Sequence, residues 1–391
     1  MPRVNGSYRI LSLDGGGSWA IIEVIALQAL WKALNVQDPV GYPDPDPRGW
    51  AVLREFDLVA ANSGGNFVLA ALACNWRLSD LYKALADPSA SQRSTMFVPL
   101  SALQKLAYAS NWIFSLLGKS GPRYDAAKKL SGIRAVYGNP PPAFLGPLGV
   151  PNDPLLPHAD ADTALDALAA RISAVNGVNT NFLITTFDFD RERAQFFRSN
   201  TDSAASGLPP SAVPTLAEAV HASSNAPIFY FNLPAQFNDP AANPAFAACR
   251  FWDGAVSGYN NPVLAAVVEA VANAGATPFN TLNVLSIGTG KVYLPLPDDP
   301  SRVAQGVADD PTMVPPRQSD GSLSSIEELA TSIGDDPPDA ASFIALTLGR
   351  LAAPVAQGIS KWAIGNGSLV RMNPLILDSA VKLEDCHGTC C

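Results

Sequence analysis

The feature that most constrains this chain is one serine, Ser63, set between an apolar strand and a helix. The segment FDLVAANSGGNFVLA (56–70) predicts a strand, a sharp turn with the serine at its apex, and then a helix. The small neighbours Ala61, Gly64 and Gly65 leave the backbone room to reverse direction at this strained turn. Such a turn holds the hydroxyl out at the top of a sheet, beside the positive end of a helix dipole. A nucleophile attacking an ester would lie there; a buried turn without chemistry is the alternative.

A second strand, turn and helix are predicted near the N-terminus, in YRILSLDGGGSWAIIEVIALQAL (8–30). The consecutive glycines Gly15–Gly17 expose backbone N–H groups with no side chain in the way, so the turn can bind a negative charge. These groups suit either a dinucleotide fingerprint or an oxyanion hole for an attacking serine. The fingerprint also needs an acidic residue at a strand end about twenty residues later. Residues 35–49 are a Pro- and Asp-rich loop instead, so the oxyanion hole is favoured.

A serine nucleophile needs a base, and the three histidines are poorly suited to that role. His387 lies in a Cys-rich tail, and fraying termini rarely hold catalytic geometry. His158 and His221 are expected to be surface or half-buried side chains. Asp253, in FWDGAVSGYNNP, follows apolar residues and precedes Gly254, so a strand end can aim it into a cleft. A desolvated carboxylate within hydrogen-bond reach takes a serine proton directly, although an isolated Asp-Gly more commonly marks a turn.

In their order along the chain, these three motifs resemble those of the patatin-like phospholipases, a family of lipid acyl hydrolases. The family's Asp-Gly-Gly-Gly oxyanion segment corresponds to residues 14–17, and its G-x-S-x-G elbow corresponds to residues 61–65. Its aspartate motif corresponds to Asp253, Gly254 and Ala255. The resemblance implies a Ser–Asp dyad rather than a triad, which removes the need for a histidine.

The likeness runs from about residue 8 to 291, and RMNPLILD (371–378) resembles a late segment of bacterial members. The chain departs from the family at two places. Ser18-Trp19-Ala20 stands where the family has x-Arg/Lys-Gly, so Trp19 supplies apolar surface and one N–H donor in place of a cation. The first elbow glycine is Ala61. Neither change touches the dyad, so hydrolysis is still expected.

The composition predicts one large α/β domain over residues 1–391. With 48% hydrophobic and 16% charged residues, the chain can bury a sizeable core. The two dyad residues lie 190 positions apart (253 − 63), so one sheet must span most of the chain. The resemblance implies a three-layer patatin-like fold, with a mostly parallel central sheet flanked by helices. The motif-bearing core is expected over residues 8–291.

The C-terminal part divides by composition. Residues 295–339 hold ten acidic and two basic residues, a net charge of −8 against −9 for the whole chain, and predict a solvated Pro- and Asp-rich loop. A helical extension is expected over 340–385, and a Cys-rich tail over 386–391. The rest of the chain is nearly neutral and has no basic patch, which argues against nucleic-acid binding and gives little attraction to anionic lipid.

No apolar run reaches the length of a transmembrane helix, and the first residues lack a signal-peptide core. A cytoplasmic protein is therefore expected. Any contact with membranes should be peripheral and made through apolar side chains. The segment 96–119 carries Phe97, Trp112 and Phe114 with few charges. It is interpreted either as a lid or membrane-docking surface beside the site, or as an ordinary core helix pair.

Cysteine usage fits a reducing compartment. Cys74 and Cys249 are expected to be buried small hydrophobes. The tail CHGTCC lacks a standard zinc spacing and is interpreted as a frayed end, with a metal site or lipid attachment as alternatives. We expect neither a metal nor a cofactor.

The expected function is phospholipase A-type hydrolysis of phospholipids or other acyl lipids through an acyl-enzyme. A soluble carboxylesterase or thioesterase would need the same dyad. A non-catalytic lipid-binding relative is the second alternative, suggested by Ser18-Trp19-Ala20.

Overall fold

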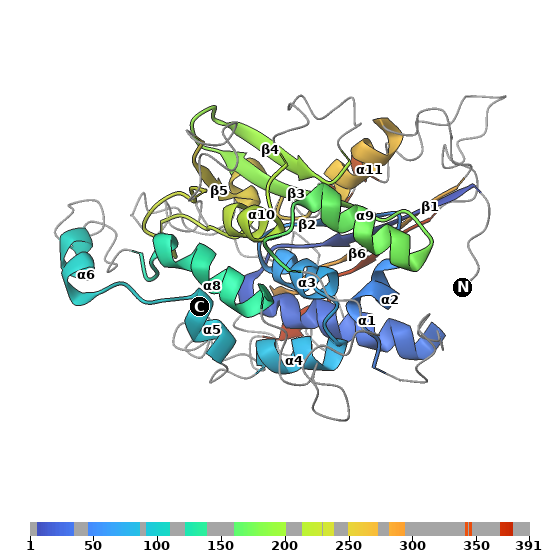
Figure 1. The fold of residues 1–391 in the computed structure, drawn as a ribbon, viewed down its shortest axis with the longest axis horizontal. Helices are drawn as coiled ribbons and strands as arrows, with labels where there is room; N and C mark the ends of the chain where they lie inside the picture. Colours follow the sequence, from blue (N-terminus) through green and yellow to red (C-terminus); the bar gives the residue numbers. More distant parts are fainter. Residues whose placement is uncertain are drawn as a thin grey trace, which may run out of the picture.

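A computed structural model places the motifs on one central sheet (Figure 1). It describes residues 6–34, 46–86, 91–109, 122–138, 160–200, 213–228, 230–237, 249–272, 281–293, 341–342, 344–345 and 368–377. The strands are β1 (Ser7–Leu13), β2 (Leu58–Ala61), β3 (Asn181–Asp188), β4 (Arg193–Arg198), β5 (Phe251–Asp253), β6 (Thr281–Ile287), β7 (Lys291–Tyr293), β8 (Ser368–Met372) and β9 (Leu375–Leu377). The helices are η1 (Gly17–Ala20), α1 (Ile21–Leu34), α2 (Gly49–Leu53), α3 (Ser63–Ala73), α4 (Leu78–Ala86), α5 (Ser91–Met96), α6 (Ala102–Ala109), α8 (Ala126–Gly138), α9 (Leu165–Asn176), α10 (Leu216–Ser223), η4 (Gly254–Ser257) and α11 (Val263–Ala272).

The main sheet has the strand order β4-β3-β2-β1-β6-β8, and β5 also pairs with β3. Strands β3, β2, β1, β6 and β8 run parallel to their neighbours, while β4 and β5 pair antiparallel to β3. The expected mostly parallel sheet is therefore confirmed. A separate two-stranded sheet joins β7 and β9.

Alternate residues of the central strands enter two different cores, which is what makes the fold three-layered. Leu11, Leu13 and Val59 pack into the larger cluster, whereas Ile10 and Leu58 pack into the smaller one. A sheet buried on both faces needs apolar side chains at successive positions, and this explains the continuous apolar runs of the sequence.

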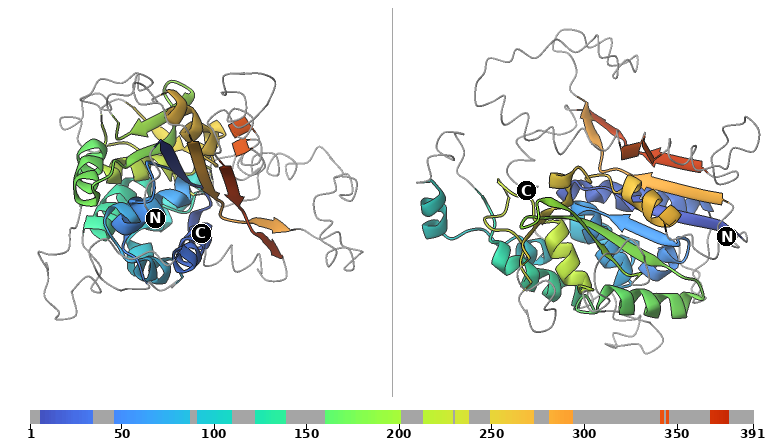
Figure 2. Two further views of the ribbon diagram at one scale, coloured as in Figure 1. Left: turned by 90° about the vertical axis from the view of Figure 1, so that its right-hand side faces the viewer. Right: turned by 90° about the horizontal axis from the view of Figure 1, so that it is seen from above.

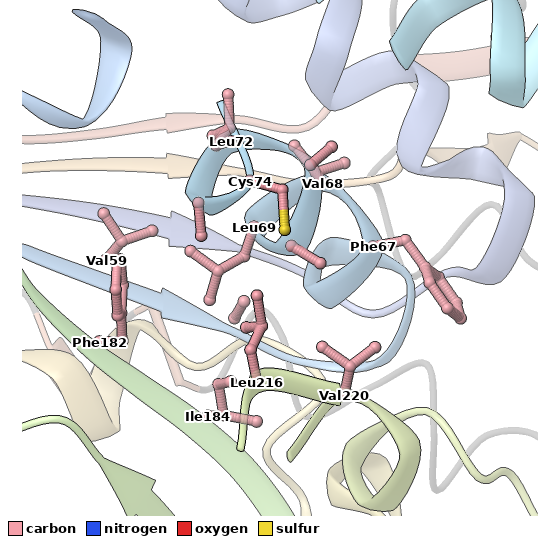
Figure 3. Packing of buried hydrophobic residues seen from close by; sticks show 14 of the residues in the cluster. Val59, Phe67, Val68, Leu69, Leu72, Cys74, Phe182, Ile184, Leu216 and Val220 are labelled. Carbon is pink, nitrogen blue, oxygen red and sulfur yellow. The ribbon is translucent and has the colours of Figure 1, made fainter. Parts of the chain in front are cut away.

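Helices cover both faces of the sheet (Figures 1 and 2). Figure 3 shows the larger core from close by, where Leu69 of α3 lies near Val59 and Ile184 of the sheet and Val220 of α10. The smaller core contains Val263 and Ala266 of α11. Helix α3 is buried at every position after its first residue, so the segment that begins with Ser63 is rigidly held.

The C-terminal segment differs from the helical extension expected over 340–385. Two strands, β8 and β9, lie within it, and 341–342 and 344–345 are helical. Strand β8 forms because it continues the parallel sheet beside β6. The acidic segment 295–339 and the tail 386–391 lie outside the described residues.

Candidate active site

The turn at Ser63 is strained in the way that the sequence predicts. Strand β2 ends at Ala61, Asn62 is extended, and Ser63 opens α3 with a φ of 44°. A residue with a Cβ rarely adopts this left-handed conformation, which costs on the order of 1–3 kcal/mol. The buried strand and helix on either side hold the serine there. Its side chain is half-buried, whereas Ala61 is fully buried beneath the turn.

The two elbow glycines are required by close contact with the N-terminal glycine turn. A Cβ on Gly64 would lie 2.6 Å from both the amide nitrogen and the carbonyl oxygen of Gly17. A Cβ on Gly65 would lie 2.7 Å from the carbonyl oxygen of Leu13. The two turns that the sequence singled out separately therefore touch each other.

Asp253 reaches the serine because of the way β5 joins the sheet. Strand β4 occupies one edge of β3 along Leu183–Asp188, and β2 occupies the other edge only as far as Ile184. Strand β5 continues that second edge, with Asp253 opposite Thr186. The aspartate therefore lies just beyond the end of β2, where Ser63 begins the helix.

The Asp253 carboxylate is almost fully buried and is hydrogen-bonded on several sides. The Ser63 side chain hydrogen-bonds to it. Its Oδ1 accepts from the amide of Ala255 at 2.9 Å and from Asn62 Nδ2 at 3.1 Å. Burial raises the pKa of Asp253 above its usual value, and these three hydrogen bonds oppose that rise. The result is a carboxylate made more basic by desolvation and aimed at the serine.

Gly254 has no room for a side chain at this junction. A Cβ there would lie 2.3 Å from Asn62 Oδ1 and 2.7 Å from Thr185 Oγ1. The Asp-Gly dipeptide thus both turns the chain and lets the aspartate approach the elbow.

Two residues that sequence reasoning missed, one on α10 and one in the segment after it, hydrogen-bond to the main chain of Ser63 and Asp253. The amide of Ser63 donates to Ser223 Oγ at 3.3 Å, and Asn66 Nδ2 donates to the same oxygen at 2.7 Å. The amide of Asp253 donates to the carbonyl of Asn225 at 3.1 Å. Nothing in the sequence run AVHASSNAPIFYF (219–231) assigns these individual contacts.

Lys129 on α8 is a third unexpected neighbour, since it is fully buried. Its Nζ donates to the carbonyl of Ser224 and lies 4.1 Å from the ring centroid of Phe231. The charge of Lys129 lowers the pKa of Asp253. Burial holds the pKa of Lys129 itself well below its ordinary value, and Asp253 opposes that shift.

The glycine turn offers fewer free donors than the sequence suggested. The amide of Gly15 donates to the carbonyl of Asn260 at 2.8 Å, so it is occupied. Within the described part of the chain, the amides of Gly16 and Gly17 make no hydrogen bond. A Cβ on Gly15 would lie 3.0 Å from Ser63 Cβ, which sets the turn directly beside the serine.

Among the described residues, no histidine takes part in the hydrogen bonds around Ser63 and Asp253. His221 is buried on α10, not half-exposed as expected, because α10 packs into the core along its whole length. Burial lowers the pKa of His221 well below its usual value. His158 and His387 lie outside the described residues.

The apolar segment 96–119 is described only in part. The Phe97 ring packs against Phe67, Tyr124 and Phe231, with centroids 5.5–6.1 Å apart, as a partly buried residue at the edge of the larger core. Trp112 and Phe114 lie outside the described residues. No described helix has the length and hydropathy needed to cross a membrane.

Among the described residues, no cluster of His, Cys, Asp and Glu side chains could hold a metal ion. Cys74 and Cys249 are buried, as expected, and neither forms a disulfide among the described residues. Burial raises the pKa of Cys74.

Comparison with known protein families identifies the family to which this chain is similar. The family model for patatin-like phospholipase matches residues 11–267, which include Ser63 and Asp253. Among curated proteins, no sequence matches this chain.

Among solved structures, VipD from Legionella pneumophila has 11% identity and a TM-score of 0.36, and the match covers 95% of this chain and 62% of VipD. ExoU from Pseudomonas aeruginosa, solved in complex with SpcU, has 14% identity and a TM-score of 0.30, and the match covers 86% of this chain and 51% of that chain. Human GIVD cytosolic phospholipase A2 has 13% identity and a TM-score of 0.26, and the match covers 55% of this chain and 24% of that chain. The chain thus spans less than two thirds of each of these proteins.

Proposed function

Because this chain belongs to the patatin-like phospholipase family, we propose that it hydrolyses fatty-acyl esters of lipids as a phospholipase A-type enzyme, with Ser63 as nucleophile and Asp253 as base. Family membership supports lipid hydrolysis as the class of activity. One observation carries the finer proposal: a strained, half-buried serine is hydrogen-bonded to a buried aspartate whose pKa is raised.

The first step forms an acyl-enzyme. The Ser63 oxygen attacks the ester carbonyl carbon while its proton passes to Asp253, so that a tetrahedral oxyanion forms. Collapse of this intermediate breaks the ester bond, and the leaving alcohol takes the proton from Asp253. A water molecule then attacks the acyl-enzyme, again giving its proton to Asp253. When this second tetrahedral intermediate collapses, the bond to Ser63 breaks, the fatty acid leaves, and the Ser63 oxygen takes the proton back from Asp253.

The oxyanion is stabilised by the amides of Gly16 and Gly17 in this proposal. Both belong to the turn that contacts the elbow, and both amides are free of hydrogen bonds among the described residues. Preorganised N–H donors of this kind stabilise the developing charge, and the loss of one costs about 10²–10³-fold in kcat. Gly15, whose amide is occupied, has the separate role of holding the turn.

Hydrolysis of a mixed lipid extract, followed by mass analysis of the products, tests the proposal. We expect the native chain to release fatty acids and lysolipids, and Ser63→Ala to lower the rate by about 10⁴-fold or more. Ser131→Ala, an exposed serine on α8, is the matched control and should keep full activity. A fluorophosphonate probe should label the native chain and not Ser63→Ala.

Three results would redirect the proposal. Activity confined to water-soluble esters would point to a carboxylesterase or thioesterase. Vesicle binding with neither hydrolysis nor probe labelling would point to a non-catalytic lipid-binding protein. Full activity of Ser63→Ala would exclude Ser63 as the nucleophile.

A further inference from the structure

Arg371 lies on the last strand of the main sheet, yet its side chain reaches the start of the glycine turn. Strand β8 pairs with β6, with Arg371 opposite Ser286, and β6 in turn pairs with β1. Figure 2 shows β8 in dark red at the edge of the sheet, next to β6. The Arg371 side chain crosses β6 to reach Asp14, the residue that follows β1.

The contact between Arg371 and Asp14 is a buried, bidentate ion pair. Nη1 donates to Asp14 Oδ1 at 2.9 Å, and Nη2 donates to Asp14 Oδ2 at 2.5 Å. Nη1 also donates to Ser286 Oγ at 2.9 Å. The exposed fractions of the two paired side chains are only 16% and 4%. This planar fork fixes the orientation of the carboxylate as well as its position.

The main chain of Asp14 ties the same residue to the catalytic elements. Its carbonyl accepts from the amide of Gly65 in the elbow helix at 2.9 Å. Its amide donates to the carbonyl of Ile287 at the end of β6, at 3.1 Å. The next residue is Gly15, whose carbonyl accepts from the Thr289 hydroxyl at 2.9 Å. A rotation of Asp14 would therefore move both the glycine turn and its contact with the elbow.

A nearby carboxyl makes the position of Asp14 dependent on its partner. Glu23 on α1 is fully buried, and burial followed by the charge of Asp14 raises the pKa of Glu23 well above its usual value. Without the guanidinium, the Asp14 carboxylate would be a buried, uncompensated charge close to a second acidic group. Breaking such a pair is strongly unfavourable, so Asp14 would turn away or take up a proton.

We propose that Arg371 is a positioning residue, which through its bidentate contact with Asp14 holds the Gly16 and Gly17 amides in line with the oxyanion formed at Ser63. This inference rests on the proposed function. It gives strand β8 a part in catalysis, although Arg371 itself touches neither the nucleophile nor the base in the described contacts.

The test compares Arg371→Met, Arg371→Lys, Asp14→Asn and the double variant Arg371→Met/Asp14→Asn in the full chain. For Arg371→Met we expect kcat on a short-chain ester to fall about 10²-fold, since a misplaced catalytic group costs about that much. The KM should change by less than about threefold, because the lost interaction belongs to the transition state. Arg371→Lys, which keeps the charge but not the fork, should fall between Arg371→Met and the native chain.

The double variant and a probe separate positioning from loss of stability. Arg371→Met/Asp14→Asn should lose no more kcat than either single variant, because both remove one interaction. The rate of fluorophosphonate labelling at Ser63 should fall in parallel with kcat. Arg198→Met is the matched control: it breaks a similarly buried ion pair with Glu269 (2.7 Å) between β4 and α11. It should lower the melting temperature without lowering kcat.

The inference is overturned if Arg371→Met keeps kcat within about twofold of the native chain, or if its loss lies wholly in KM. It is also overturned if Arg198→Met loses as much kcat at a comparable melting temperature. If Arg371→Met does not fold, the kcat and labelling rate of Arg371→Lys decide the same question. A native chain that hydrolyses no ester and is not labelled at Ser63 would instead overturn the proposed function, and this inference with it.

Discussion

At the scale of single residues, the site depends on a conformation that Ser63 adopts at a cost. A serine with φ near 44° is held by its surroundings and not by its own preference. The amide of Ser63 is anchored to Ser223, while its side chain is hydrogen-bonded to Asp253. The main chain and the side chain of the serine are therefore fixed by different elements, so its oxygen has little freedom before substrate binds.

The pH dependence of hydrolysis follows from the burial of Asp253. In the proposed mechanism the base must be ionised, so kcat/KM should fall as the pH drops through the pKa of Asp253, which burial raises above the usual aspartate value. The charge of Lys129 lowers that pKa. Lys129→Met should therefore move the acidic limb of the kcat/KM profile to higher pH.

The control for this shift is the adjacent lysine. Lys128 has a side chain that is 59% exposed and lies 3.9 Å from Asp125. Lys128→Met should leave the acidic limb in place. The electrostatic role given to Lys129 would be contradicted if the acidic limb of the kcat/KM profile kept its pH in Lys129→Met, or if it shifted equally in both variants.

At the scale of elements, the proposed catalytic arrangement is a contact between two turns. The elbow between β2 and α3 presses on the glycine turn that leads into η1, and Gly64 lies at their interface. The carbonyl of Asp14 accepts a hydrogen bond from Gly65 across the same interface. The distance between the proposed nucleophile and the proposed oxyanion donors is thus set by backbone packing. Side chains of other segments hydrogen-bond to each turn, Ser223 to the elbow and Thr289 to the glycine turn.

Gly64→Ala tests this contact. The new methyl group would lie 2.6 Å from the Gly17 backbone, so the two turns must separate, and we expect kcat to fall about 10²-fold. Gly177→Ala is the control, because Gly177 ends α9 with a φ of 68° and has open space around it. It should cost about 1 kcal/mol of stability and leave kcat unchanged. A Gly64→Ala variant with native kcat would show that the turns are not held this closely.

At the scale of the whole molecule, contact with lipid should be apolar in character. The acidic segment 295–339 accounts for −8 of the net charge of −9, so the remainder of the chain has almost none to attract anionic lipid. Leu103 on α6, within the apolar segment 96–119, is 80% exposed.

We therefore expect Trp112→Ser combined with Phe114→Ser to weaken binding to phospholipid vesicles, with little effect of salt on the native binding. Hydrolysis of a soluble short-chain ester should be spared. Val175→Ser, which removes a half-exposed valine from α9, should leave vesicle binding unchanged. An equal loss of vesicle binding and soluble-ester hydrolysis in the Trp112/Phe114 variant would contradict a docking role for the segment.

Much of the fold and of the candidate site could be predicted from local patterns in the sequence. The elbow, the glycine turn and the Asp-Gly turn each carry small residues where the backbone bends or approaches another segment closely. Successive apolar residues along β1 and β2 predict a sheet buried on both faces, which the two cores confirm. Such patterns are readable because each depends on the backbone geometry of a few neighbouring residues.

The remaining features are contacts between distant parts of the chain. Asp14 and Arg371 are 357 positions apart, and the sequence around either residue does not predict their contact. The burial of Lys129, the anchoring of Ser63 by Ser223 and the occupation of the Gly15 amide by Asn260 likewise arise only when separate elements pack. The sequence by itself determined which residue types could perform the chemistry. Tertiary structure alone decided which donors stay free and which charges face the dyad, because burial and hydrogen-bond geometry exist only once the elements meet.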